Sequence, residues 1–424
     1  MRIEAICIGT ELLSGDTLNT NLAFLGEALA QVGCELSREV CIPDTLSEME
    51  TELREALSRA DIVLVVGGLG PTRDDLTRIA ASHVLEKTLV ESKAVRETIE
   101  AYLEKRRHSI PDTAVQAQSM VLEGVDILPN LNGTAPGQWC DVEYGSLAML
   151  PGPPHEFGTM VIDQIVPRIL AKVSARRCTT AILTTGIGES QVARQVDDVM
   201  QLFPGVDVGY CAKPFGVAVR LISDCEVHLR EAEDAVRETL GAHALPPGTS
   251  GLPEEIGRLL LEAGLCLATA ESCTGGGIAA AITDVPGASA YFHGAVVTYS
   301  NSWKMKLLDV SRETLETAGA VSDRTVDEML DGVLGLPGVS AAVAVSGVAG
   351  PGGGTPEKPC GLVYIGAAVE ERRKIRELQF PGNRDTVRIR TTATALGMLR
   401  DLLVQLAVER GHKTMQPNWN QHSK

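Results

Sequence analysis

The segment from Thr269 to Gly277 combines a serine with a glycine-rich turn, a pairing that can support acyl-transfer chemistry. It follows a predicted strand and opens an alanine-rich helix, so Ser272 should lie near free amides and the positive end of the helix dipole. A serine in that position could act as a nucleophile, with backbone N–H groups as its oxyanion hole. The alternative is an N-cap serine, since serine is among the preferred helix caps.

A second segment, from Val297 to Lys304, supplies a candidate base. We expect a strand ending at Tyr299 and then a helix capped by Asn301 or Ser302, which would place Tyr299 and Lys304 at one edge of the sheet. A serine lacks a strong base of its own, and a lysine desolvated in a pocket can have its pKa lowered enough to act as one. A tyrosine could relay the proton. The alternative for Lys304 is a solvated surface lysine.

The third segment is a glycine-dense loop from Ser346 to Gly361, which follows a predicted strand over 340–345. Loops after parallel strands are where α/β sheets bind ligands, and their exposed N–H groups suit a phosphate. Arg384 and Arg388 open the last helix and could pair with that phosphate. The alternatives are a flexible loop and ordinary surface arginines. The residues predicted to contact substrate at this site are Thr274, Gly275, Gly276, Asn301, Ser346, Gly347, Gly352, Gly353, Gly354, Arg384 and Arg388.

Acidic residues follow two predicted strands near the amino terminus. Glu11 comes after the strand at 3–8, and Asp74 and Asp75 come after the strand at 62–66 and its glycine-rich turn. Such loops gather at one sheet edge, so the three carboxylates could converge on a divalent ion such as Mg²⁺, which in turn binds phosphate oxygens. Alternatively, the two aspartates only open a helix, where acidic residues are favoured. The residues predicted to contact substrate here are Gly67, Gly68, Thr72 and Asn132.

Strand and helix patterns alternate in both halves of the chain, which favours α/β domains with mostly parallel sheets. The segment between them is a small α+β region, and proline and glycine cluster at 245–253 as in a linker. The predicted architecture is therefore a multidomain α/β protein. Its predicted parts are residues 1–170, 175–245 and 252–412, with a polar tail over 413–424.

The composition limits the classes of function. The 424 residues carry a formal net charge of −17 and only 4% aromatics. Such a chain is a poor binder of nucleic acid or anionic membrane, and it has few aromatic side chains on which nucleic-acid bases could stack. Ten cysteines without a C-x-x-C pair fit a reduced, cytoplasmic protein, and a P-loop is absent. We expect small phosphorylated ligands, no nucleic acid, no membrane, and a homo-oligomer.

Three motifs in the last third of the chain resemble the CinA (competence/damage-inducible protein) family. They are A-E-S-C-T-G-G, V-T-Y-S-N-x-x-K and S-G-x-A-G-P-G-G-G-T-x-x-K-P, in that order within about 252–410. The resemblance implies an amidohydrolase that deamidates nicotinamide mononucleotide (NMN) without a metal or other cofactor. The family's catalytic serine, tyrosine and lysine correspond to Ser272, Tyr299 and Lys304.

The chemistry that this resemblance implies passes through an acyl-enzyme. Lys304, helped by Tyr299, would deprotonate Ser272, and the serine would attack the carboxamide carbon of NMN. Backbone N–H groups near Thr274 and Gly275 would hold the oxyanion. Ammonia would leave, and water would release nicotinate mononucleotide.

The motif G-G-L-G-P-T-x-D-D lies in a segment, about 1–170, that is similar to the amino-terminal half of the same family and to molybdopterin-binding domains of the MoaB/MogA type. This resemblance implies metal-dependent hydrolysis of ADP-ribose to AMP and ribose 5-phosphate, in which the metal neutralises the diphosphate and activates a water. The segment at about 175–245 corresponds to the family's KH-like domain. It lacks a basic G-x-x-G loop, which argues against RNA binding.

Together these motifs predict a bifunctional cytoplasmic enzyme of pyridine-nucleotide salvage, because NMN and ADP-ribose are both phosphorylated breakdown products of NAD. Two alternatives stay open. The amino-terminal domain could only bind a molybdopterin-like ligand, since a fold does not fix a function. The chain could also be a non-enzymatic partner in competence or DNA damage.

Overall fold

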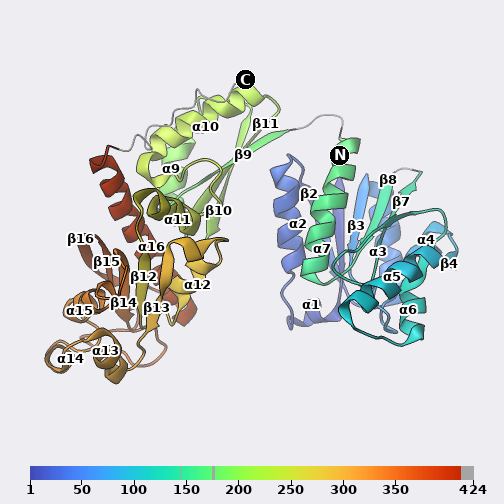
Figure 1. The fold of residues 1–424 in the computed structure, drawn as a ribbon. Helices are drawn as coiled ribbons and strands as arrows, with labels where there is room; N and C mark the ends of the chain where they lie inside the picture. The colour runs from blue at the N-terminus through green and yellow to red at the C-terminus, as the bar shows by residue number, and fades with distance from the viewer. Residues whose placement is uncertain (144, 174–176, 412–424) are drawn as a thin grey trace. The chain divides into compact units, whose positions relative to one another are not determined.

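The computed structural model describes residues 1–411 except 144 and 174–176, so the tail predicted over 413–424 lies outside the described residues. The chain divides into two compact units (Figure 1). One unit comprises Met1–Thr180 and Ile222–Leu229. The other comprises Ala181–Leu221 and the chain from Arg230 onwards. Among the described residues, no helix has both the length and the apolar character needed to cross a bilayer.

The first domain is built on a six-stranded sheet in the order β2-β1-β3-β8-β7-β6. Strands β2, β1, β3 and β8 run parallel, whereas β7 and β6 continue the sheet in antiparallel fashion. Every residue of β1 and β3 is buried, as expected for strands covered on both faces. The strands are β1 (Ile3–Ile8), β2 (Leu36–Ile42), β3 (Ile62–Val66), β6 (Asp126–Leu128), β7 (Gly137–Val142) and β8 (Gly145–Leu150).

Helices cover both faces of this sheet (Figure 1). Helices α2 (Thr20–Gln31), α7 (Pro154–Met160) and α8 (Val166–Lys172) pack on one face, with a π-helical turn between α7 and α8. Helices α3 (Leu46–Arg59) and α4 (Thr77–Leu85) pack on the other. The remaining elements are α1 (Thr10–Ser14), β4 (Leu89–Glu91), α5 (Lys93–Arg106), α6 (Asp112–Ser119) and β5 (Met120–Leu122).

The middle domain is a three-stranded sheet in the order β10-β11-β9 with two amphipathic helices. Its strands are β9 (Cys178–Leu183), β10 (Val206–Lys213) and β11 (Gly216–Ser223), and its helices are α9 (Glu189–Met200) and α10 (Glu226–Leu240). Only Pro214 and Phe215 separate β10 from β11, so the two strands form a hairpin. Strand β10 is not predicted from the sequence, because most of its residues are half-buried or exposed and do not form an apolar run.

The last domain holds a five-stranded sheet in the order β13-β12-β14-β15-β16. The first three strands are parallel, and β15 and β16 are antiparallel, so this sheet is mixed, as is the six-stranded sheet of the first domain. Helices α11, α12 and α16 cover one face, and α13 and α15 the other. The elements are α11 (Leu252–Ala263), β12 (Leu267–Glu271), α12 (Gly277–Thr283), β13 (Phe292–Val297), α13 (Asn301–Leu308), α14 (Arg312–Thr317), α15 (Asp323–Leu334), β14 (Ala341–Gly347), β15 (Leu362–Val369), β16 (Arg372–Gln379) and α16 (Arg384–Glu409).

The middle and last domains share one hydrophobic core. Leu245 is buried in the core of the last domain, and Leu183 and Phe215 of the middle domain pack against it. The buried Arg400 of α16 donates from Nη1 to the carbonyl oxygen of Ala242 at 2.8 Å. The stretch predicted to be a linker therefore begins at a residue that is part of a packed interface.

Candidate functional sites

Ser272 and Lys304 meet at the carboxyl edge of the last domain's sheet. Strands β12 and β13 are parallel neighbours that end in register, at Glu271 and Val297, so the residues that follow them lie side by side. Lys304 Nζ lies 3.0 Å from Ser272 Oγ and donates to the carbonyl oxygen of Thr298 at 2.7 Å. Ser272 is 8% exposed and Lys304 only 1%.

Lys304 is a buried amine whose charge is not offset by a carboxylate. Among the described residues it forms no ion pair, and its hydrogen-bond partners are a hydroxyl and a carbonyl. Desolvation by burial lowers the pKa of Lys304 from 10.5 to about 8. A neutral amine can accept a proton from the serine hydroxyl across the same 3.0 Å contact, while one of its own N–H groups stays on Thr298. The pair therefore has the geometry of a nucleophile and its base.

The sequence predicts that the first amides of helix α12 face Ser272, but in the structure they donate to another side chain. The helix begins at Gly277, and the buried carboxylate of Glu271 accepts hydrogen bonds from the amides of Gly276, Ile278 and Ala279 at 2.9, 3.1 and 2.9 Å. The hydroxyls of Thr269 and Thr274 also donate to this carboxylate. The Glu271 carboxylate thus satisfies the first amides of α12, whose N-cap residue is Gly276, and it fixes the turn that carries Ser272.

The contacts of Glu271 are not predicted from the sequence. The only signal is its place, a carboxylate at the end of an apolar strand and directly before a glycine-rich helix start.

Two amides next to Ser272 remain available to an oxyanion. The Gly275 amide, one of those expected to hold the oxyanion, donates to the Ser272 carbonyl at 3.1 Å. The amides of Cys273 and Thr274 interact with the Cys273 thiol, a weak acceptor. Burial raises the pKa of this thiol to about 11, so it stays protonated. The donors closest in sequence to the nucleophile are therefore Cys273 and Thr274.

Tyr299 lies on the rim of the site. Its side chain is 62% exposed, and its hydroxyl accepts a hydrogen bond from Arg384 Nη2 at 2.7 Å. Arg384 also donates to the carbonyl oxygen of Gly350 at 2.9 Å, so the arginine links Tyr299 to the glycine-dense loop. The structure therefore brings Ser272 and Lys304 together and leaves the tyrosine paired with an arginine.

The other predicted contact residues of this site fall into two groups. Arg388 donates from Nε and Nη2 to the Thr274 carbonyl, and so supports the nucleophile turn together with Gly275 and Gly276. Ser346 is buried and donates to the Ala320 carbonyl, which ties it to the fold. The exposed members of the predicted set are Asn301, Gly352, Gly353 and Gly354, and Gly347 is half-buried. The expected cap at Asn301 or Ser302 is wrong, because Ser300 caps α13 and accepts from the Trp303 amide.

A second site is a cavity of about 580 Å³ at the carboxyl edge of the first domain's parallel strands. Its wall includes Glu11, Gly67, Gly68, Asp74 and Asp75 of the predicted set. The other two predicted residues, Thr72 and Asn132, do not line the cavity but form hydrogen bonds that stabilise neighbouring loops. Thr72 donates to Asp75, and Asn132 donates to the His155 carbonyl and to Thr159 Oγ1.

The G-G-L-G turn on the cavity wall is held in place by side chains of helix α4. Gly67 and Gly68 have φ angles of 105° and 65°, and a Cβ on Gly68 would lie 2.2 Å from Thr77 Oγ1. Only glycine fits there. The buried Arg78 donates to the carbonyls of Leu69 and Gly70 at 2.8 and 2.9 Å. The role of Arg78 is not predicted from the sequence, where its signal is an arginine in the first turn of the helix after the glycine-rich turn.

Asp75 holds the turn from its other side. Its carboxylate accepts from the Gly70 amide and from the amide and hydroxyl of Thr72, at 2.8, 2.8 and 2.5 Å. In the part of the chain that the structure describes, no three His, Cys, Asp or Glu side chains gather as a ready-made metal site. The expected convergence of Glu11, Asp74 and Asp75 is therefore not seen, because Asp75 is engaged with the backbone.

Glu156 is a further cavity residue that the sequence analysis leaves without a role. Its carboxylate accepts from Asn130 Nδ2 at 2.5 Å, and a Cβ on Gly133 would lie 2.1 Å from Glu156 Oε2. Burial raises the pKa of Glu156. A carboxyl group so placed on the wall of a polar cavity is a candidate for proton transfer.

Comparison with protein families gives three matches along the chain. The Probable molybdopterin binding domain matches residues 4–171, the Damage-inducible protein CinA KH domain matches 179–244, and the CinA C-terminal domain matches 249–403. These matches confirm the predicted three-domain layout. They include every residue of both candidate sites.

Relatives match over nearly the whole chain. A CinA-like protein of Akkermansia muciniphila is 41% identical over 407 residues, which cover 95% of this chain and 97% of the relative. A CinA-like protein of Kosmotoga olearia is 36% identical over 414 residues, covering 96% and 100%. The solved structure of the competence/damage inducible protein CihA from Agrobacterium tumefaciens is 42% identical, covers 37% of this chain and 97% of that chain, and has a TM-score of 0.35.

Proposed function

Since the chain belongs to the CinA family, we propose that its last domain hydrolyses the carboxamide of NMN, with Ser272 as nucleophile and Lys304 as base. The observation that carries this proposal is the 3.0 Å contact between Lys304 Nζ and Ser272 Oγ in a buried setting. A lysine without a partner carboxylate costs stability when it is charged. A role as a neutral base would account for a buried lysine placed beside a serine.

The proposed reaction uses the chain's own groups throughout. Lys304 takes the hydroxyl proton of Ser272 as Oγ bonds to the carboxamide carbon, and the amides of Cys273 and Thr274 bind the oxyanion. Lys304 then gives the proton to the departing nitrogen, the C–N bond breaks, and ammonia leaves. Water attacks the resulting ester, its proton passes through Lys304 to Ser272 Oγ, and nicotinate mononucleotide is released. A relay by Tyr299 would require its side chain to turn from Arg384 towards Ser272.

The direct test is ammonia release from NMN in the presence of a metal chelator. We expect release of one ammonia for each nicotinate mononucleotide formed, undiminished by the chelator. Absence of both products at millimolar NMN would refute the deamidase proposal.

The deamidation rate should rise with pH through the pKa of Lys304. Because burial lowers that pKa to about 8, the amine is neutral above pH 8 and increasingly charged below it. We therefore expect kcat/KM for NMN to level off above pH 8 and to fall about tenfold per unit below it, reaching roughly 100-fold at pH 6. A profile that is flat from pH 6 to pH 9 would exclude Lys304 as the base.

The same shift affects stability with a definite sign. Between pH 8 and pH 10.5 the folded chain binds fewer protons at Lys304 than the unfolded chain does. The free energy of unfolding therefore increases as pH rises through that window, so this lysine makes the folded chain more stable at the higher pH.

For the first domain we propose hydrolysis of ADP-ribose to AMP and ribose 5-phosphate. The support is the polar 580 Å³ cavity, large enough for a nucleotide, with a rigid glycine turn and the carboxylates of Glu11 and Asp74 on its wall. A hydrogen bond from Thr72 lowers the pKa of Asp74 and keeps it ionised. Glu11 and Asp74 would hold a divalent ion together with phosphate oxygens, as Mg²⁺ sites commonly do. When bound, the ion would supply charge neutralisation at the diphosphate.

Removal of divalent metal should separate the two activities. We expect a chelator, or Glu11→Gln with metal present, to lower AMP release from ADP-ribose by about 100-fold or more. NMN deamidation should be unchanged in both cases, which makes it the internal control. If wild-type protein with Mg²⁺ or Mn²⁺ releases no AMP, the pyrophosphatase proposal fails, and binding of a molybdopterin-type ligand becomes the better reading.

A further inference from the structure

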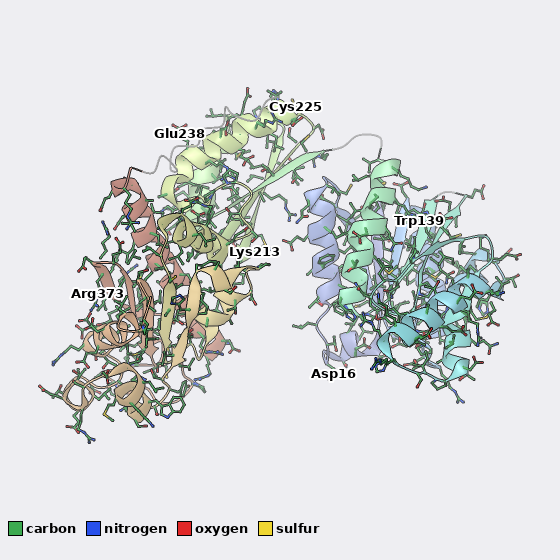
Figure 2. The ribbon with its side chains drawn as sticks, viewed as in Figure 1. Asp16, Trp139, Lys213, Cys225, Glu238 and Arg373 are labelled. Carbon is green, nitrogen blue, oxygen red and sulfur yellow. The ribbon has the colours of Figure 1, made fainter. Side chains whose placement is uncertain are left out.

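The hairpin of the middle domain forms one wall of a cavity beside the nucleophile turn. This cavity has a volume of about 260 Å³. Pro214 and Phe215, between β10 and β11, line it on one side, and Figure 2 labels Lys213, the last residue of β10, directly before them. The residues of the last domain that line it are Thr274, Gly277, Asp385, Arg388, Ile389 and Thr392.

The cavity is linked to the catalytic pair through Thr274, which comes two residues after Ser272. The Thr274 carbonyl accepts from Arg388 Nε at 3.2 Å and from Nη2 at 2.8 Å. The Thr274 hydroxyl donates to Glu271, whose carboxylate accepts from the first amides of α12. A ligand in the cavity would therefore contact the same turn that carries the nucleophile.

The lining suits one end of a nucleotide. Phe215, Pro214 and Ile389 offer apolar surface, and Thr392 offers a hydroxyl. Arg388 uses two of its N–H groups on Thr274, and its Nη1 lies 3.9 Å from Oδ1 of the exposed Asp385. The guanidinium is 38% exposed, so a phosphate could reach its remaining donors if it displaced this long contact with Asp385. Small ligand sites commonly combine such apolar walls with a few placed polar groups.

We propose that the middle domain supplies part of the substrate pocket of the amidohydrolase, with Phe215 as a residue that determines specificity for the mononucleotide. In this arrangement Phe215 packs against the ribose-phosphate end of the substrate while Arg388 binds its phosphate. The proposal rests on the function proposed for Ser272. It also gives the KH-like domain a task that needs no nucleic acid.

The test separates binding from chemistry. KM and kcat for NMN are measured for wild type, Phe215→Ala and Phe215→Leu, with Leu202→Ala as the control. Leu202 lies in the same domain and is 75% exposed. We expect Phe215→Ala to raise KM about tenfold with kcat within about twofold, Phe215→Leu to fall between, and Leu202→Ala to match wild type.

A melting curve for each variant shows whether it is folded, since Phe215 also packs on the shared core. A folded Phe215→Ala or Phe215→Leu protein with the wild-type KM would overturn the proposal. If wild type releases no ammonia, the deamidase proposal fails. The pocket is then tested by comparing the affinity of wild type and Phe215→Ala for NMN, measured by calorimetry. Weaker binding by Phe215→Ala would support the pocket, whereas equal or undetectable binding would overturn it.

Discussion

Ser272→Ala is expected to lower the rate of ammonia release from NMN by roughly 10³-fold or more, the largest effect of any single change in the chain. Without Oγ, no acyl-enzyme can form, and the oxyanion donors alone retain only a small residual rate. The fold should hold, because the structure gives this hydroxyl a single contact, with Lys304. The measurement is kcat for deamidation, supported by a trapping experiment in which wild type alone accumulates a covalent adduct.

The matched control is Cys273→Ala at the next residue. Cys273 carries the other candidate nucleophile in the turn, but burial raises its pKa to about 11 and keeps it protonated. We expect this variant to retain deamidation within a few fold, since its amide is preserved. Full loss in Cys273→Ala together with retention in Ser272→Ala would reverse the assignment.

Lys304→Ala should produce the second largest loss, about 10²- to 10⁴-fold in kcat, which is the usual range for a general base. Its remaining activity should also lose the rise with pH that is centred near 8. Lys304→Arg should be nearly as inactive, because a guanidinium stays charged and cannot accept the serine proton. The outcome against the proposal is a Lys304→Ala enzyme with wild-type turnover.

Lys306→Ala on the same helix is the control for this loss. Lys306 is exposed, whereas Lys304 is buried. Wild-type activity in Lys306→Ala would show that the loss comes from the buried amine and not from a change of charge on α13.

The meeting of Ser272 and Lys304 was predictable because it depends on backbone topology. Two parallel strands that end in register bring the residues after them to one edge, and the apolar runs of β12 and β13 are visible in the sequence. The glycine turn of the first domain was predictable for the same reason. Each of these predictions needs only the ends of strands and not the direction of a side chain.

The direction of polar side chains was not predictable. Tyr299 could face Ser272 or solvent, and its pairing with Arg384 depends on a helix that begins 85 positions later. The Asp75 carboxylate could bind either a metal or the turn that precedes it. In the structure it accepts hydrogen bonds from the Gly70 amide and from the amide and hydroxyl of Thr72, all in that turn. Glu271 is the last residue of the buried strand β12, and nothing in the sequence shows that its carboxylate accepts from the first amides of α12.

The core shared by Leu245, Leu183 and Phe215 has a consequence for how the chain can be divided. The chain matches three family models, yet the middle and last domains bury apolar side chains against each other and are joined by the hydrogen bond from Arg400 to the Ala242 carbonyl. We therefore expect these two domains to fold as one cooperative unit, although they match different family models. A molecule that binds only at the Ser272–Lys304 site should therefore raise the folding stability of the KH-like domain as well.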